Sequence, residues 1–126
     1  MNILGEDTSV IEREGHLARK IYVRQIGVET GRFRMKDHDD IIPLLHTLRR
    51  STFFSRNHGF YHPRLLHFAC CLVYLDVAFD EIAEFTRRFL RHPAFPTQKQ
   101  RMGKVVPVHY AGVSYLQAYV KKGVGA

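Results

Sequence analysis

Short apolar segments separated by polar and turn-forming residues predict a series of strands along the chain. Residues 1–4, 21–23 and 52–55 have strand character, and residues 71–77 are apolar almost throughout. A continuous apolar run of this kind is typical of a central strand that is covered on both faces. Residues 105–110 and 113–119, on either side of an Ala-Gly pair, resemble the two arms of a closing β-hairpin.

Helical patterns fall between these segments. Thr8 or Ser9 is placed to cap a helix that runs to about residue 16, and Glu12 is placed to complete a capping box. A second pattern opens at residue 39, and residues 80–91 form the clearest helix, with an apolar stripe and arginines near its end. Strands that alternate with helices predict an α/β fold with a mainly parallel central sheet, flanking helices and the C-terminal hairpin. The length suits one domain over residues 1–126.

The charge balance bears on the kind of partner. The chain has 19 Lys and Arg against 12 Asp and Glu, so its formal net charge is +7. Such an excess favours an anionic partner, either a nucleic acid or an acidic protein. Charge alone does not choose between them, and many small basic proteins bind neither.

The two cysteines and the apolar runs bear on the compartment. Cys70 and Cys71 are adjacent, and neighbouring residues of a strand point to opposite faces, so we expect two buried thiols rather than a disulfide. Such thiols suit a reducing compartment. No apolar run approaches the ~20 residues of a membrane helix, and residues 1–13 lack an apolar signal core. We therefore expect a cytoplasmic protein with no membrane association.

Three acidic residues and one asparagine lie next to the ends of predicted strands and helices. Glu6 and Asp7 come after the first strand, Asp39 begins a helix, and Asn57 follows the strand at residues 52–55. Because functional groups of open α/β sheets collect at the carboxyl ends of strands, these side chains are expected to meet at one edge. Mg²⁺ and Mn²⁺ prefer such oxygen ligands. The alternative reading is that these acids are solvated or stabilise helix dipoles.

Three motifs resemble those of the small bacterial PIN-like family, which is related to the PIN domains of VapC-type toxins. Ile3-Leu4-Gly5-Glu6-Asp7 matches a Leu-Leu-Asp-Glu-Asn motif, with Gly5 in the place of the leading aspartate. Asp39-Asp40-Ile41-Ile42 matches a helix-starting Asp-x-x-Ile motif. Ser55-Arg56-Asn57-His58-Gly59-Phe60 matches Thr-x-Asp-x-Asp-Phe in outline, with Asn57 and Gly59 in the places of aspartates. The likeness extends over nearly the whole chain.

The resemblance implies a three-layer PIN-like domain that cleaves RNA with Mg²⁺ or Mn²⁺. It assigns metal binding to Glu6, Asp7 and Asp39, and catalysis to these three with Asn57. It also implies the toxin component of a toxin–antitoxin system, with an acidic antitoxin as partner. The alternative is a catalytically degenerate module that binds RNA or a partner protein. The RNA target is left open, and so is a homodimer.

Basic, aromatic and histidine side chains near the predicted functional edge of the sheet can be interpreted in two ways, as RNA-binding groups or as ordinary surface and core residues. Arg49, Arg50, Arg56 and His58 are candidates for RNA phosphate contacts, or for a solvated surface. The aromatic residues of this region could stack on bases, although core packing is the stronger expectation: Phe53, Phe54, Phe60 and Tyr61. The eight histidines lack the spacing of a structural zinc site, so surface or loop positions are expected for them.

Overall fold

The computed structural model describes residues 1–5, 8–32, 34–110, 112–113 and 116–117. The strands are β1 (Asn2–Leu4), β2 (Arg24–Gln25), β3 (Ser51–Ser55), β4 (Cys70–Asp76), β5 (Lys104–His109), β6 (Gly112–Val113) and β7 (Leu116–Gln117). The α-helices are α1 (Val10–Ala18), α2 (Ile42–Thr47), α3 (Ile82–Leu90) and α4 (Gln98–Arg101). A π-helical turn, η1 (Asp37–Ile41), leads into α2, and 3₁₀ turns form η2 (His58–Phe60), η3 (Pro63–Leu65) and η4 (Phe79–Glu81).

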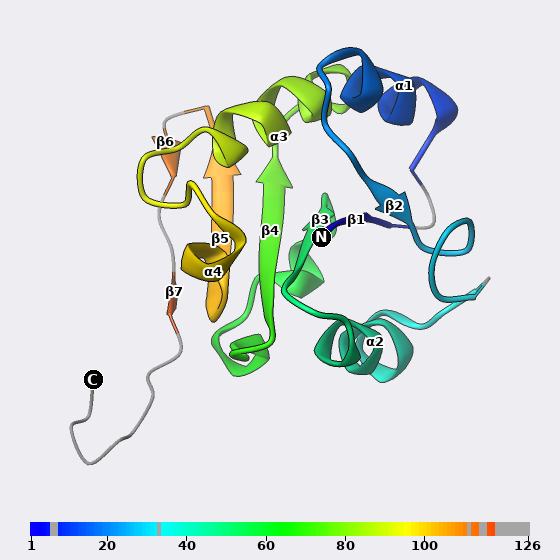
Figure 1. Cartoon of the computed structure of the whole chain (residues 1–126), viewed down its shortest axis with the longest axis vertical. Coiled ribbons are helices and arrows are strands. Elements are labelled where there is room, and N and C mark those ends of the chain that lie inside the picture. Colours follow the sequence, from blue (N-terminus) through cyan, green and yellow to red (C-terminus); the bar gives the residue numbers. More distant parts are fainter. Residues whose placement is uncertain (6–7, 33, 111, 114–115, 118–126) are drawn as a thin grey trace.

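Five strands form a parallel sheet in the order β2-β1-β3-β4-β5 (Figure 1). Strands β6 and β7 both pair with β5 in the antiparallel sense, as the closing hairpin predicted. The predicted α/β fold with a mainly parallel sheet is therefore confirmed. The order also reverses direction at β1, because the chain passes from β1 outward to β2 and returns to place β3 on the other side of β1.

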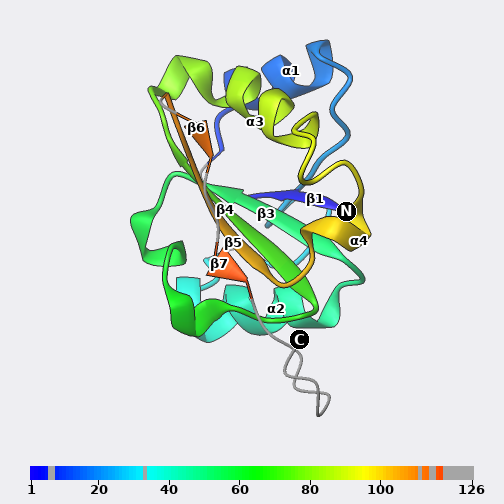
Figure 2. The same ribbon diagram turned by 90° about the vertical axis from the view of Figure 1, so that its left-hand side faces the viewer.

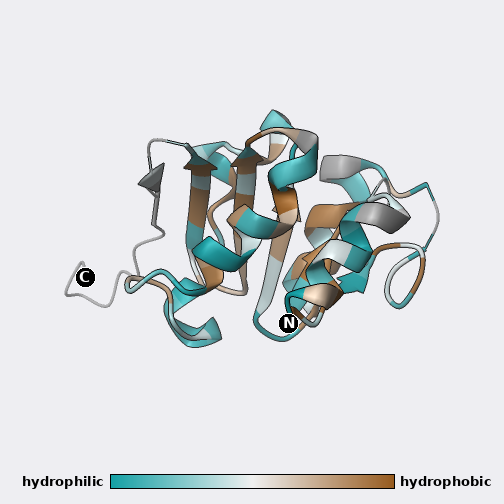
Figure 3. Cartoon of the chain, turned by 90° about the horizontal axis from the view of Figure 1, so that it is seen from above, coloured by the Kyte–Doolittle hydropathy of each residue, from teal (hydrophilic) through white to brown (hydrophobic). Residues whose placement is uncertain are grey.

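Helices cover both faces of the sheet, which gives three layers (Figure 2). On one face, α1 and α3 cover a core that includes Phe54, Val73 and Phe89. On the other face, η1 and α2 cover a second core that includes Phe53 and Leu72. The strands supply alternate side chains to the two cores, so the centre of the molecule is mostly apolar (Figure 3). Strand β4 is buried along most of its length, as expected for a central strand.

Several boundaries differ from the predicted ones. Ser9 caps α1 through its hydroxyl, which accepts the Glu12 N–H, but the helix continues past Gly15 to Ala18. The strand expected at residues 21–23 is instead the two-residue β2, and the turn η3 is likewise short. These segments are short, so pairing with β1 and local capping determine their ends rather than any apolar period. Helix α4, at residues 98–101, has no apolar stripe and was not predicted.

The cysteines and one histidine test the predicted burial of polar side chains. Cys70 and Cys71 are buried free thiols, as expected, and burial raises the pKa of Cys70 to about 11. The expectation of a surface or loop position is wrong for His16, which is fully buried between α1 and α3. Its ring nitrogens contact the Glu12 carbonyl oxygen at 2.6 Å and the Thr86 hydroxyl at 3.2 Å. Because each ring nitrogen has a polar partner, burial of His16 leaves no ring nitrogen without a hydrogen-bond partner.

Candidate functional site

A cleft of about 490 Å³ opens at the carboxyl ends of β1 and β3. Its floor is apolar and includes Leu4, Phe53 and Phe60. Its upper walls come from the segment after β3, the start of α1 and the turn that precedes η1. In open α/β sheets, ligands bind outside the carboxyl ends of the strands, where the strand order reverses. The cleft lies at that reversal, between β1 and β3.

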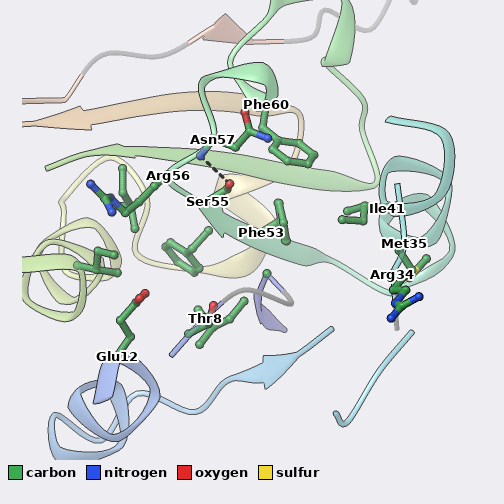
Figure 4. A pocket seen from close by; sticks show the side chains of 15 residues that line it. Thr8, Glu12, Arg34, Met35, Ile41, Phe53, Ser55, Arg56, Asn57 and Phe60 are labelled. Carbon is green, nitrogen blue, oxygen red and sulfur yellow. Dashed lines mark hydrogen bonds between the residues drawn. The ribbon is translucent and has the colours of Figure 1, made fainter. Parts of the chain in front are cut away.

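Polar and charged side chains line the cleft from several elements (Figure 4). Arg34 and Arg56 lie on opposite sides, while Thr8 and Glu12 approach from the side of α1. Arg34 has a left-handed backbone conformation, with φ of 59°. A non-glycine residue adopts this conformation at a cost of about 1–2 kcal/mol, which the surrounding turn must offset. The arrangement gives the cleft a cationic group at each side.

Asn57 holds the segment after β3 in a fixed conformation. Its backbone N–H donates to the Ser55 hydroxyl at 2.9 Å (Figure 4), and its side-chain oxygen accepts the Gly59 N–H at 2.9 Å. The second bond caps η2. Asn57 therefore lines the cleft and has a structural role, which is distinct from the predicted catalytic role.

The predicted metal ligands are placed as follows. Glu6 and Asp7 lie outside the described residues, next to Gly5, which lines the cleft. Asp39 is exposed on η1, two residues before Ile41, which also lines the cleft. Its neighbour Asp40 pairs with Arg32 at 3.2 Å and accepts the Lys36 N–H at 2.8 Å. The Lys36 N–H, and next the nearby Arg32, lower the pKa of Asp40.

A divalent-ion site is not complete among the described residues. Within that part of the chain, no group of three His, Cys, Asp or Glu side chains is arranged to hold a metal ion. Glu12 is the carboxylate that lines the described cleft, and sequence reasoning had considered it as a capping residue alone. The described residues alone thus do not make a complete donor set for Mg²⁺ or Mn²⁺, two of the predicted ligands, Glu6 and Asp7, lie outside them, and we derive no catalytic step through an ion.

The basic candidates divide between the two ends of β3. Arg56 follows the strand and lines the cleft, whereas Arg49 and Arg50 precede the strand and are exposed at its amino end. A five-residue strand spans about 17 Å, so the predicted position of Arg49 and Arg50 beside the cleft is wrong. The second arginine of the cleft is Arg34, which sequence reasoning missed because the loop before η1 carries no periodic signal.

The aromatic side chains of this region mostly belong to the core. Phe53, Phe54 and Phe60 are at most 3% exposed, so the core reading is confirmed for them. Tyr61 is half-buried and His58 is exposed. These two side chains remain accessible beside the cleft.

Comparisons with known proteins add no further constraint. No family model, no curated protein and no solved structure matches the chain. Among the described residues, no helix is long and apolar enough to cross a membrane.

Proposed function

We propose that the chain is a PIN-like protein that binds single-stranded RNA in the cleft between β1 and β3. One observation carries the proposal: the cleft lies where the strand order reverses and has an arginine on each of two opposite sides, Arg34 and Arg56. Guanidinium groups bind phosphate oxygens through paired N–H donors. Thr8, Ser55 and Asn57 add polar groups between the arginines. The net charge of +7 favours the approach of a polyanion.

We further propose that the bound RNA is hydrolysed with Mg²⁺ or Mn²⁺, as the PIN-like resemblance implies. Glu6, Asp7 and Asp39 are the proposed ligands, and Glu12 is a further carboxylate of the same cleft. The support is positional, because Glu6 and Asp7 directly follow Gly5, a residue of the cleft wall. Gly5 and Asn57 stand where the PIN-like motifs have aspartates. If the remaining carboxylates are too few to hold the ion, the chain binds RNA without cleaving it.

Partner-protein binding is a second candidate function, and a groove beside α1 favours it. Leu17 and Val28 line this groove and are 66% and 63% exposed. The charged residues that line the groove are Arg13 and Glu14, and Lys20 and Arg24 are exposed nearby in the sequence, so we propose an acidic partner such as an antitoxin for the basic residues at its margin. The groove shares Thr8 with the RNA cleft, but neither Arg34 nor Arg56 lines it.

A single experiment separates these functions. The protein is incubated with labelled single-stranded RNA in Mn²⁺ and, in parallel, in EDTA. Cleavage in Mn²⁺ together with binding in EDTA supports the ribonuclease, and binding without cleavage in either buffer supports the degenerate module. If the folded protein neither binds nor cleaves RNA, the proposal is wrong and the partner-binding surface becomes the better account.

A further inference from the structure

Three aromatic side chains form a cluster beside the RNA cleft, outside its lining. The rings of Tyr61 and Tyr74 are nearly parallel, with 12° between their planes and 6.1 Å between their centres. His58 lies edge-on to both, at 5.2 Å from Tyr74 and 6.0 Å from Tyr61. We call these three residues the aromatic cluster. His58 is exposed and the two tyrosines are half-buried.

The sheet explains why Tyr74 stays accessible. Tyr74 shares a face of β4 with Cys70 and Leu72, which are buried beneath the layer of η1 and α2. Its neighbours across the sheet are Ser55 on β3 and Pro107 on β5, which are both small. No large side chain from either neighbouring strand therefore stands directly beside the ring. In place of α2, the turn η2 covers this part of the face.

The aromatic cluster is continuous with the cleft. Ser55, Asn57 and Phe60 line the cleft, and His58 lies between the last two in sequence. Arg56 also lines the cleft and lies close enough to Tyr74 for its charge to act on the phenol. One short segment after β3 thus joins an arginine of the cleft to the aromatic cluster.

Contacts with the rings of His58 and Tyr61 restrict the Tyr74 ring. Asp76, two residues further along β4, lies on the same face of the strand as Tyr74. Partial burial, and next the carboxylate of Asp76, raise the pKa of Tyr74. The ring is therefore neutral at physiological pH and held in place. An aromatic ring that is already ordered loses little conformational entropy when a flat ligand stacks on it.

We propose that the aromatic cluster binds an unpaired base of the RNA strand whose phosphates lie in the cleft. This inference rests on the proposed function and adds a subsite beside the cleft that takes an unpaired base, since a base in a duplex cannot reach the rings. Every base has a π-face, so stacking here tolerates many sequences. Proteins that bind single-stranded nucleic acids combine a positively charged groove, which follows the backbone, with aromatic side chains, on which the bases stack.

The test measures the affinity of labelled single-stranded RNA in EDTA, which keeps the strand intact. Tyr74→Leu removes the ring and keeps an apolar side chain, so affinity should fall about tenfold, as for the loss of one base–aromatic contact. Tyr74→Phe keeps the ring and should bind within about twofold of the wild type. Tyr22→Leu is the matched control, because Tyr22 is 82% exposed and lies outside the aromatic cluster, and it should bind as the wild type.

A second arm uses the same strand with its bases removed. The abasic strand should bind the wild type about tenfold more weakly than the intact strand, and this difference should shrink in Tyr74→Leu. Tyr61→Leu, at a position outside the strands, serves the same purpose if Tyr74→Leu does not fold. Equal loss of affinity on base removal in the wild type and the variant would overturn the inference.

The outcomes distinguish this inference from the proposed function. If Arg34→Ala and Arg56→Ala weaken RNA binding while Tyr74→Leu and Tyr61→Leu do not, the aromatic cluster is not a base site and RNA binding by the cleft stands. If duplex RNA binds as tightly as the single strand, the inference is likewise wrong. If the folded wild type binds no RNA, both proposals fail.

Discussion

The side-chain oxygen of Asn57 accepts the backbone N–H of Gly59 at 2.9 Å, and this hydrogen bond caps the turn η2, which follows β3 beside the cleft. The PIN-like pattern has aspartates at both positions. In this chain the first position is an amide that caps the turn, and the second is the glycine that the amide binds. The two positions at which this chain differs from the PIN-like motif are therefore hydrogen-bond partners in one turn.

Substitutions of Asn57 distinguish its role as a cap of η2 from the effect of having an amide where the PIN-like motif has a carboxylate. Asn57→Asp keeps an oxygen acceptor for the Gly59 N–H, so we expect the free energy of unfolding to change by less than about 0.5 kcal/mol. It also adds a carboxylate to the cleft, which should strengthen Mn²⁺ binding and increase RNA cleavage. Asn57→Ala loses the cap and should destabilise the fold by about 1 kcal/mol. Urea unfolding and Mn²⁺ titration of both variants measure these effects.

The result for Asn57 has a clear contrary outcome. If Asn57→Asp leaves both Mn²⁺ affinity and cleavage unchanged in a protein that already cleaves, then residue 57 does not contribute to the ion site. The alignment of this segment with the PIN-like motif would then be wrong.

Gly5 offers a second restoring substitution. A Cβ added at Gly5 would lie 3.9 Å from the Phe53 ring, an ordinary contact, so the cleft wall has room for a side chain. Gly5→Asp should therefore fold and should increase the rise in melting temperature that Mn²⁺ produces by binding the folded state. Gly5→Asn has nearly the same shape without the charge and serves as the control.

The same melting experiment tests the proposed ligands. Glu6→Gln and Asp39→Asn should each remove the Mn²⁺-dependent rise in melting temperature, because each deletes one negative charge of the proposed site. A wild-type melting temperature that stays constant up to millimolar Mn²⁺, and stays so in Gly5→Asp, argues against any ion site at this edge.

Glu84 should make stability depend on pH. Hydrogen bonds from Arg87 at 2.8 Å and Arg88 at 2.9 Å lower the pKa of Glu84 from 4.5 to about 2 in the folded protein. Because the folded pKa is the lower one, this contribution to stability is full above the unfolded pKa. It is lost as the pH falls from about 4.5 towards 2. Glu84→Gln should reduce the loss of unfolding free energy across this range.

Urea unfolding at a series of pH values measures this effect. The wild type and Glu84→Gln should differ most near neutral pH and converge as the pH approaches the folded pKa of Glu84. A constant difference between them at every pH would mean that the ion pairs with Arg87 and Arg88 do not act on the titration of Glu84.

The sheet could be predicted from the sequence because its central strands are strongly marked. Residues 71–77 are apolar almost throughout, and the observed β4 differs from that range by one residue at each end. In contrast, β2 has two residues and its position depends on pairing with β1, a contact between distant parts of the chain. A periodic pattern cannot mark an element of that length.

The candidate site was predicted in outline but not in its members. Residues that directly follow strands, such as Arg56 and Asn57, were placed correctly because the carboxyl end of a strand is readable from the sequence. Arg34 was missed because a loop of irregular backbone brings it to the cleft. Tyr74 was missed because its accessibility depends on Ser55 and Pro107, the small residues on the neighbouring strands.

The salt dependence of RNA affinity tests the central claim most directly, namely that the cleft binds the RNA backbone. The variant Arg34→Ala/Arg56→Ala removes both cationic side chains of the cleft. The control Arg49→Ala/Lys99→Ala removes the same net charge from exposed positions that precede β3 and β5. Both variants lower the charge equally, so a difference between them reports position rather than charge.

We predict that Arg34→Ala/Arg56→Ala binds single-stranded RNA at least tenfold more weakly at low salt. If each arginine contacts one phosphate, the slope of log affinity against log salt should also fall in magnitude by about 1.4. The control variant should keep a slope close to that of the wild type. Equal slopes and equal affinities for the two variants, in proteins shown to be folded, would contradict RNA binding at the cleft.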